Sequence, residues 1–170
     1  MNTQTNKCKY YENLFLNNWK KICQYDETII QLSNRYKINK YILKSVVVIE
    51  QLNRGSLLIS CVEKLITIFF PKFVMSKNFS IGICQIKPNT ALKVGLKIKD
   101  KNKLIQMLML PKLNIHVCAK ILAAVKNESI QNQILFYATG TKELLYFFCP
   151  EVILYYHLCS ISTKNKNFDF

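Results

Sequence analysis

The chain has 170 residues, of which half are hydrophobic and only four are Gly and four Pro. A chain of this length and composition forms one domain with a sizeable core and is not disordered over most of its length. Its 24 Lys and Arg residues exceed its 10 Asp and Glu residues, for a formal charge of +14, which favours polyanionic partners such as nucleic acid, an anionic membrane surface or the bacterial wall.

Hydrophobic residues recur at three- and four-residue spacing along most of the chain, which predicts amphipathic helices. In chain order the predicted helices cover Tyr10–Cys23, a segment capped by Asp26, Lys40–Leu52, Ser56–Phe70, Lys103–Leu110, Asn114–Lys126, Glu128–Phe136 and Thr141–Leu158. We predict an irregular connection over residues 72–80, a short extended piece over 80–86, and frayed ends over 1–9 and 160–170. The expected fold class is mainly α, in a single domain spanning residues 1–170.

The seven cysteines contain no CxxC pair, and the two histidines do not complete a zinc site. We therefore expect no metal, no cofactor and no disulfide framework. The N-terminal residues lack the pattern of an ordinary signal peptide, so synthesis in the cytoplasm is expected. Charged residues and prolines interrupt both long apolar runs, over residues 57–74 and 144–158, so no transmembrane segment is predicted.

The most informative segment runs from Ser80 to Ala91 and reads SIGICQIKPNTA. It resembles the Gly-Leu-Met-Gln-Ile-x-Pro-x-Thr-Ala signature of lytic transglycosylases and goose-type lysozymes. The positions that match are Gly82, Gln85, Ile86, Pro88, Thr90 and Ala91. Two later segments follow in the family's order: Asn114–Leu122 resembles the Asn-Ile-x-x-Gly-x-x-x-Leu helix, and Tyr137–Gly140 resembles the Tyr-Asn-Ala-Gly turn.

The resemblance covers residues 43–157 and implies a lysozyme-like helical domain with at most a short β element around the signature. It implies peptidoglycan glycan strands as the partner and action on the bacterial wall. We expect a monomer and no nucleic-acid partner.

Cleaving a β-1,4 glycosidic bond requires a carboxylic acid that stays protonated near neutral pH, which needs an apolar environment. Glu50 meets this requirement best, because it follows four β-branched residues, Val46–Ile49, at the end of a predicted helix. The alternative is a solvated glutamate paired with Lys44 or Arg54. Glu63 is the alternative acid, or else a partner for Arg54.

The resemblance also implies that Ser80, Gly82, Gln85 and Tyr137 take part in substrate binding. Gln85 would hydrogen-bond sugar or backbone, and the Tyr137 hydroxyl would lie near the scissile bond, although a tyrosine in an apolar segment is more often part of the core. His116 is predicted to be a surface residue. The chain departs from the family pattern at Gln51, Ala138 and Thr139.

The resulting hypothesis is a lytic transglycosylase that cleaves the MurNAc–GlcNAc bond with one glutamate acting as acid and then as base. A goose-type lysozyme would hydrolyse the same bond. An inactive lysozyme-like domain that binds glycan or has a structural role is the first alternative. The second is a basic helical nucleic-acid-binding protein, which the charge of +14 and the lysine cluster Lys97–Lys103 support, although no recognisable nucleic-acid-binding motif is present.

Overall fold

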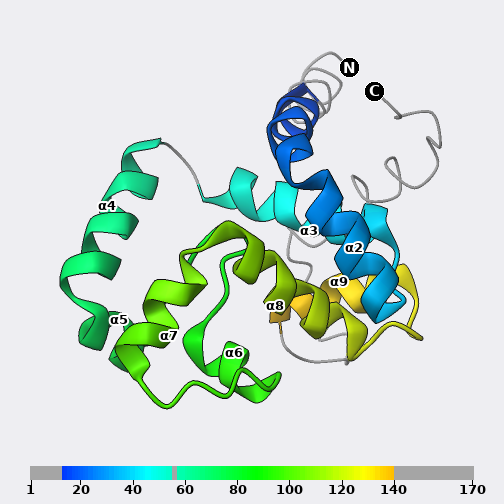
Figure 1. The fold of residues 1–170 in the computed structure, drawn as a ribbon. Coiled ribbons are helices and arrows are strands. Elements are labelled where there is room, and N and C mark those ends of the chain that lie inside the picture. The colour runs from blue at the N-terminus through cyan, green and yellow to red at the C-terminus, as the bar shows by residue number, and fades with distance from the viewer. Residues whose placement is uncertain (1–12, 55–56, 140–170) are drawn as a thin grey trace.

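The computed structural model describes residues 13–54 and 57–139. Most of these residues lie in helices (Figure 1). Residues 13–22 form a helix that leads into the others. The elements that follow are η1 Cys23–Tyr25, α2 Asp26–Tyr36, α3 Lys40–Asn53, α4 Leu57–Phe69, α5 Pro71–Lys77, α6 Pro88–Lys93, α7 Lys101–Leu108, α8 Pro111–Ala123 and α9 Ile130–Thr139. The described part of the chain has no β-strand beyond one isolated antiparallel bridge, between Ile81 and Ile86. The predicted mainly α fold with a short β element at the signature is confirmed.

The helices begin where the sequence supplies suitable first residues. The side chains of Asn39 and Asp100 cap α3 and α7 by accepting hydrogen bonds from backbone N–H groups of the first turn. Helices α5, α6 and α8 each begin with a proline, namely Pro71, Pro88 and Pro111. Proline suits this position because a backbone N–H in the first turn of a helix has no hydrogen-bond partner within the helix, so its absence costs nothing.

Helix α3 forms the centre of the core. Every residue from Ile42 to Ile49 is buried, and the helix packs against α2 and α8. Lys44 lies within this run, with its ammonium 2.7 Å from the Asp26 carboxylate and 4.5 Å from the centre of the Trp19 ring. Lys44 therefore pairs with Asp26.

Two predictions about elements need correction. The irregular connection predicted over residues 72–80 contains helix α5, because Pro71 starts a new helix as well as ending α4. Asp26 is the first residue of α2, and its side chain does not cap the helix. The helix predicted over residues 141–158 lies outside the described residues.

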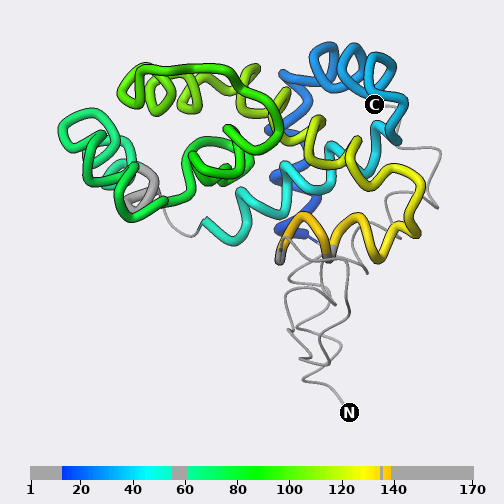
Figure 2. Tube along the Cα trace, turned by 90° about the horizontal axis from the view of Figure 1, so that it is seen from below, coloured from blue at the N-terminus to red at the C-terminus, as the bar shows by residue number. Residues whose placement is uncertain are grey.

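The helices are arranged along an elongated body. Both views place α4, α5 and α7 towards one end and α2 and α9 towards the other, with α3 and α8 running between them (Figures 1 and 2). Side chains from α3, α4, α8 and α9 form hydrogen bonds with the signature segment, residues 80–91.

Candidate functional site

The signature segment forms a tight turn closed at its base by two isoleucines. The backbone N–H of Ile81 donates to the carbonyl of Ile86 and the reverse bond also forms, both at 2.9 Å. Both side chains are buried. At the tip, Gly82 and Gln85 have positive φ values of 78° and 49°. The extended piece predicted over residues 80–86 is thus a pair of bridging residues around a four-residue tip.

Gly82 has no room for a side chain. A Cβ atom there would lie 2.5 Å from the Leu108 carbonyl oxygen and 2.6 Å from Nδ2 of Asn114. Both distances are too short for non-bonded atoms, and the positive φ adds strain for any residue other than glycine. Gly82 therefore lets the turn sit directly on the α7–α8 connection.

Asn114 holds the turn from beneath and is fully buried. Its Oδ1 accepts from the Cys84 N–H at 2.7 Å, and its Nδ2 donates to the carbonyls of Ile81 at 3.0 Å and Leu108 at 2.8 Å. One amide side chain thereby pairs three backbone groups that would otherwise be buried without partners. The sequence motif included Asn114, but reasoning from the sequence assigned it no role.

Two more side chains hold carbonyls of the tip. Nε2 of Gln51, on α3, donates to the Ile83 carbonyl at 2.6 Å. The Tyr137 hydroxyl, on α9, donates to the Cys84 carbonyl at 2.6 Å. Gln51 is one of the positions at which the sequence departs from the signature pattern. Its hydrogen bond to Ile83 connects the turn to α3, the helix that carries Glu50.

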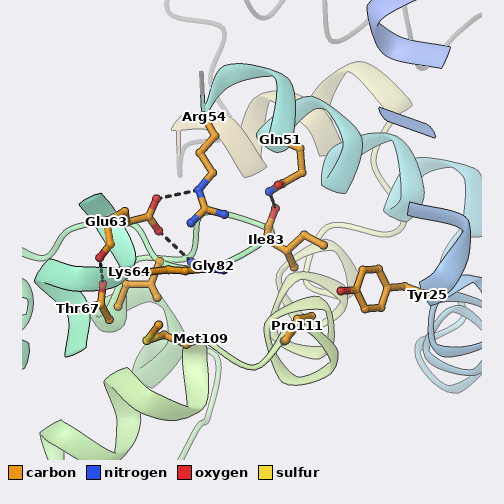
Figure 3. A pocket seen from close by; sticks show the side chains of 11 residues that line it. Tyr25, Gln51, Arg54, Glu63, Lys64, Thr67, Gly82, Ile83, Met109 and Pro111 are labelled. Carbon is orange, nitrogen blue, oxygen red and sulfur yellow. Dashed lines mark hydrogen bonds and ion pairs between the residues drawn. The ribbon is translucent and has the colours of Figure 1, made fainter. Parts of the chain in front are cut away.

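Glu63, on α4, contacts the turn from its open side (Figure 3). Its Oε2 lies 2.8 Å from Nε of Arg54, and its Oε1 accepts from the Gly82 N–H at 3.3 Å. Nε2 of Gln85 lies 3.4 Å from both carboxylate oxygens and 3.0 Å from the Gly82 carbonyl. The pairing of Glu63 with Arg54 confirms one of the two roles predicted for Glu63.

Two cavities border Glu63. One of about 320 Å³ is lined by Tyr25, Gln51, Arg54, Glu63, Lys64, Thr67, Ile81, Gly82, Ile83, Met109 and Pro111 (Figure 3). The other, of about 330 Å³, is lined by Val62, Glu63, Ile66, Thr67, Val74, Phe79, Ser80 and Gln85. Three predicted binding residues, Ser80, Gly82 and Gln85, therefore share cavity walls with Glu63, whereas Glu50 and Tyr137 line neither of these two cavities.

Glu50 lies near the end of α3, half-buried after the buried run Ile42–Ile49. Burial raises the pKa of the Cys84 thiol, with further contributions from Cys118 and the Glu50 carboxylate. Burial also raises the pKa of Tyr137, with contributions from Cys118, Cys84 and Glu50. The Glu50 charge therefore contributes to the raised pKa of both Cys84 and Tyr137. The Tyr137 hydroxyl and the Cys84 carbonyl are themselves joined by a hydrogen bond.

His116 is not the surface residue that the sequence predicted. It is half-buried on α8, and its Nε2 lies 2.5 Å from the Tyr36 hydroxyl on α2. Burial lowers the pKa of His116, and the nearby cations of Arg35 and Lys120 lower it further. His116 thus belongs to the contact between α2 and α8. Within residues 13–54 and 57–139, no three His, Cys, Asp or Glu side chains gather as a metal site would require.

The comparisons with known proteins bear on the second half of the described chain. Residues 69–143 match the family model of the Transglycosylase SLT domain. The match contains the signature turn, Asn114 and Tyr137, and it begins after both Glu50 and Glu63. Searches of curated proteins and of solved structures give no match.

Proposed function

From the premise that residues 69–143 carry a transglycosylase SLT domain, we propose that the protein is a lytic transglycosylase with Glu50 as its acid and base. The substrate is peptidoglycan, and the bond cleaved is the β-1,4 linkage between MurNAc and GlcNAc. The observation that carries the proposal is the signature turn within the matched segment, which side chains from four helices hold in one geometry.

Two glutamates compete for the role of the acid, and their surroundings differ. Glu63 accepts hydrogen bonds from Arg54 and from the Gly82 N–H. These contacts engage the Glu63 carboxylate in holding the turn. Glu50 is half-buried and follows the buried apolar run Ile42–Ile49, and the proposal gives it the acid role because a general acid needs an apolar setting.

In the proposed reaction, the Glu50 carboxyl gives its proton to the glycosidic oxygen as the bond breaks. The carboxylate that remains then takes the proton of the muramoyl C6 hydroxyl, whose oxygen attacks C1 and closes a 1,6-anhydro ring. No water enters the product. Ser80 and Gln85 are the proposed sugar contacts, whereas Glu63 and Tyr137 position the turn.

Product analysis on purified peptidoglycan tests this function. The proposal predicts soluble fragments ending in 1,6-anhydro-MurNAc, identified by mass spectrometry. Fragments heavier by one water molecule would identify a hydrolase of the lysozyme type. A matched control is Glu27→Gln, because Glu27 is exposed on α2 and its loss should leave the products unchanged.

An inactive glycan-binding domain is the second candidate, and one observation favours it. The glutamate that borders both cavities, Glu63, is engaged by Arg54. If purified peptidoglycan retains the protein in a pull-down but releases no fragments, the inactive domain replaces the enzyme as the better reading.

A further inference from the structure

An apolar corner projects at the junction of α4 and α5. We define it by six residues, Leu65, Ile68, Phe69, Phe70, Phe73 and Phe79, all of them exposed. Phe69 and Phe70 are the most exposed, at 68% and 62%. Large apolar side chains gathered on one exposed surface mark an interaction site rather than ordinary surface variation.

The corner is built by the local fold and not by a single unusual side chain. Leu65, Ile68 and Phe69 are spaced by three and four residues, so they share one face of α4. Phe70 then separates the two helices, Pro71 starts α5, and Phe73 packs edge-on against Phe79 at 5.6 Å. Both views place α4 at the outer end of the molecule, on the side away from α2 and α9 (Figures 1 and 2).

The charged residues of the chain segment that carries the corner are all of one sign. From Lys64 to Lys99 the chain contains no Asp or Glu, although Glu63 and Asp100 flank this stretch. Within it lie seven lysines, all exposed: Lys64, Lys72, Lys77, Lys87, Lys93, Lys97 and Lys99. Lys64, Lys72 and Lys77 come from the same two helices as the corner itself. The partner must therefore be apolar at its centre and negatively charged over a wide area.

We propose that the apolar corner docks on an anionic lipid bilayer, with Phe69 and Phe70 inserted at the interface and the lysines on the headgroups. Aromatic and aliphatic side chains next to lysines form the combination that binds peripheral proteins to anionic membranes. A second copy of the chain fits this surface poorly, because a two-fold contact would bring the lysines of both copies together. Within residues 13–54 and 57–139, no helix is long and apolar enough to cross a membrane.

This proposal does not rest on the proposed function, and its test needs no glycan. The full chain is sedimented with vesicles of phosphatidylcholine and phosphatidylglycerol, and separately with vesicles of phosphatidylcholine alone. We expect binding to the anionic vesicles and an about tenfold lower partition coefficient for the double variant Phe69→Ser/Phe70→Ser. The triple variant Lys64→Gln/Lys72→Gln/Lys77→Gln should also lose about tenfold, and added salt should weaken the unchanged protein.

Matched controls separate the corner from the rest of the surface. Leu110→Ser removes an apolar side chain that is 57% exposed outside the corner. Lys37→Gln/Lys40→Gln/Lys126→Gln removes three exposed lysines distant in the chain from the corner. Both controls should bind within about twofold of the unchanged protein, and circular dichroism should show native helix content in every variant.

Three outcomes would overturn the proposal. The first is no binding to anionic vesicles by the unchanged protein. The second is binding that Phe69→Ser/Phe70→Ser leaves intact. The third is a dimer in sedimentation velocity that the same double variant converts to a monomer, since the corner would then be an interface between copies. Digestion of membrane-free peptidoglycan should not change in the double variant, so failure of membrane docking remains distinguishable from failure of the enzyme.

Discussion

Gly82 and Gly95 separate two reasons for which a position requires glycine. Both have positive φ values, 78° and 90°, but only Gly82 is enclosed. The nearest atom to an added Cβ at Gly95 is the Lys120 ammonium at 3.6 Å, an ordinary contact distance, whereas at Gly82 it is the backbone oxygen of Leu108 at 2.5 Å. Backbone strain acts at both positions, and steric overlap acts at Gly82 alone.

Alanine at these two positions should therefore differ in its cost. We predict that Gly82→Ala lowers the free energy of unfolding by about 3–5 kcal/mol and Gly95→Ala by about 1–2 kcal/mol, because only the first adds a clash to the strain. Urea denaturation measures both. Equal losses would mean that the turn does not sit on the α7–α8 connection as described.

His116 links stability to pH. Its pKa is lowered from the ordinary histidine value near 6.5, first by burial and then by Arg35 and Lys120. His116 therefore binds fewer protons in the folded protein than in the unfolded chain near and below that value, and its contribution to stability falls with decreasing pH. The contribution is fully present above about pH 6.5 and is lost as the pH falls through the lowered value.

We predict that the free energy of unfolding decreases on acidification below about pH 6.5 and that His116→Gln reduces this slope. The control is Tyr41→Phe. Tyr41 is half-buried, as is Tyr36, so this change removes a hydroxyl from a similar setting but leaves the contact between Tyr36 and His116 intact. Tyr41→Phe should keep the slope. A steeper slope in His116→Gln than in the unchanged protein would contradict the prediction.

At the scale of elements, the sequence predicted most helices because their hydrophobic periodicity and their prolines are local signals. It missed α5, since the exposed Phe73 disturbs the expected amphipathic pattern of this short helix. The motifs predicted which segments belong to the site, and the pairing of Arg54 with Glu63 followed from their proximity in the chain. The roles of Gln51, Asn114 and Tyr137 could not be predicted, because each binds a backbone carbonyl more than 30 residues away and depends on how the helices pack.

Asn114 joins the signature turn to α8 and provides the test at this scale. Asn114→Leu keeps the size of the side chain but leaves three buried backbone groups without their partner. We predict a loss of about 3 kcal/mol or more in the free energy of unfolding, with peptidoglycan cleavage lost in parallel. Asn34→Leu, at an exposed position on α2, should change stability by less than about 0.5 kcal/mol. A stable and active Asn114→Leu variant would show that the turn is held by other means.

At the scale of the whole molecule, the charge of +14 favours anionic partners, and the match of residues 69–143 to the SLT family model makes the bacterial wall the partner to test. Peptidoglycan lies outside the inner membrane, so activity depends on the compartment. We predict that a fused periplasmic leader makes the protein lytic in a Gram-negative host and that cytoplasmic expression without the leader does not. The same leader on Glu50→Gln should cause no lysis. Lysis by that variant would point to membrane damage in place of glycan cleavage.

The rate at which peptidoglycan releases 1,6-anhydro products tests the assignment of the acid most directly, measured for Glu50→Gln, Glu63→Gln and the control Glu27→Gln. Each change is nearly isosteric and removes a single carboxyl. We predict that Glu50→Gln reduces the rate by about 10²–10⁴-fold, the contribution of a general acid and base, with native stability retained. Glu63→Gln should keep a measurable rate despite the loss of its ion pair with Arg54, and Glu27→Gln should match the unchanged protein. A Glu50→Gln variant with full activity, together with an inactive Glu63→Gln variant, would contradict the assignment and identify Glu63 as the acid.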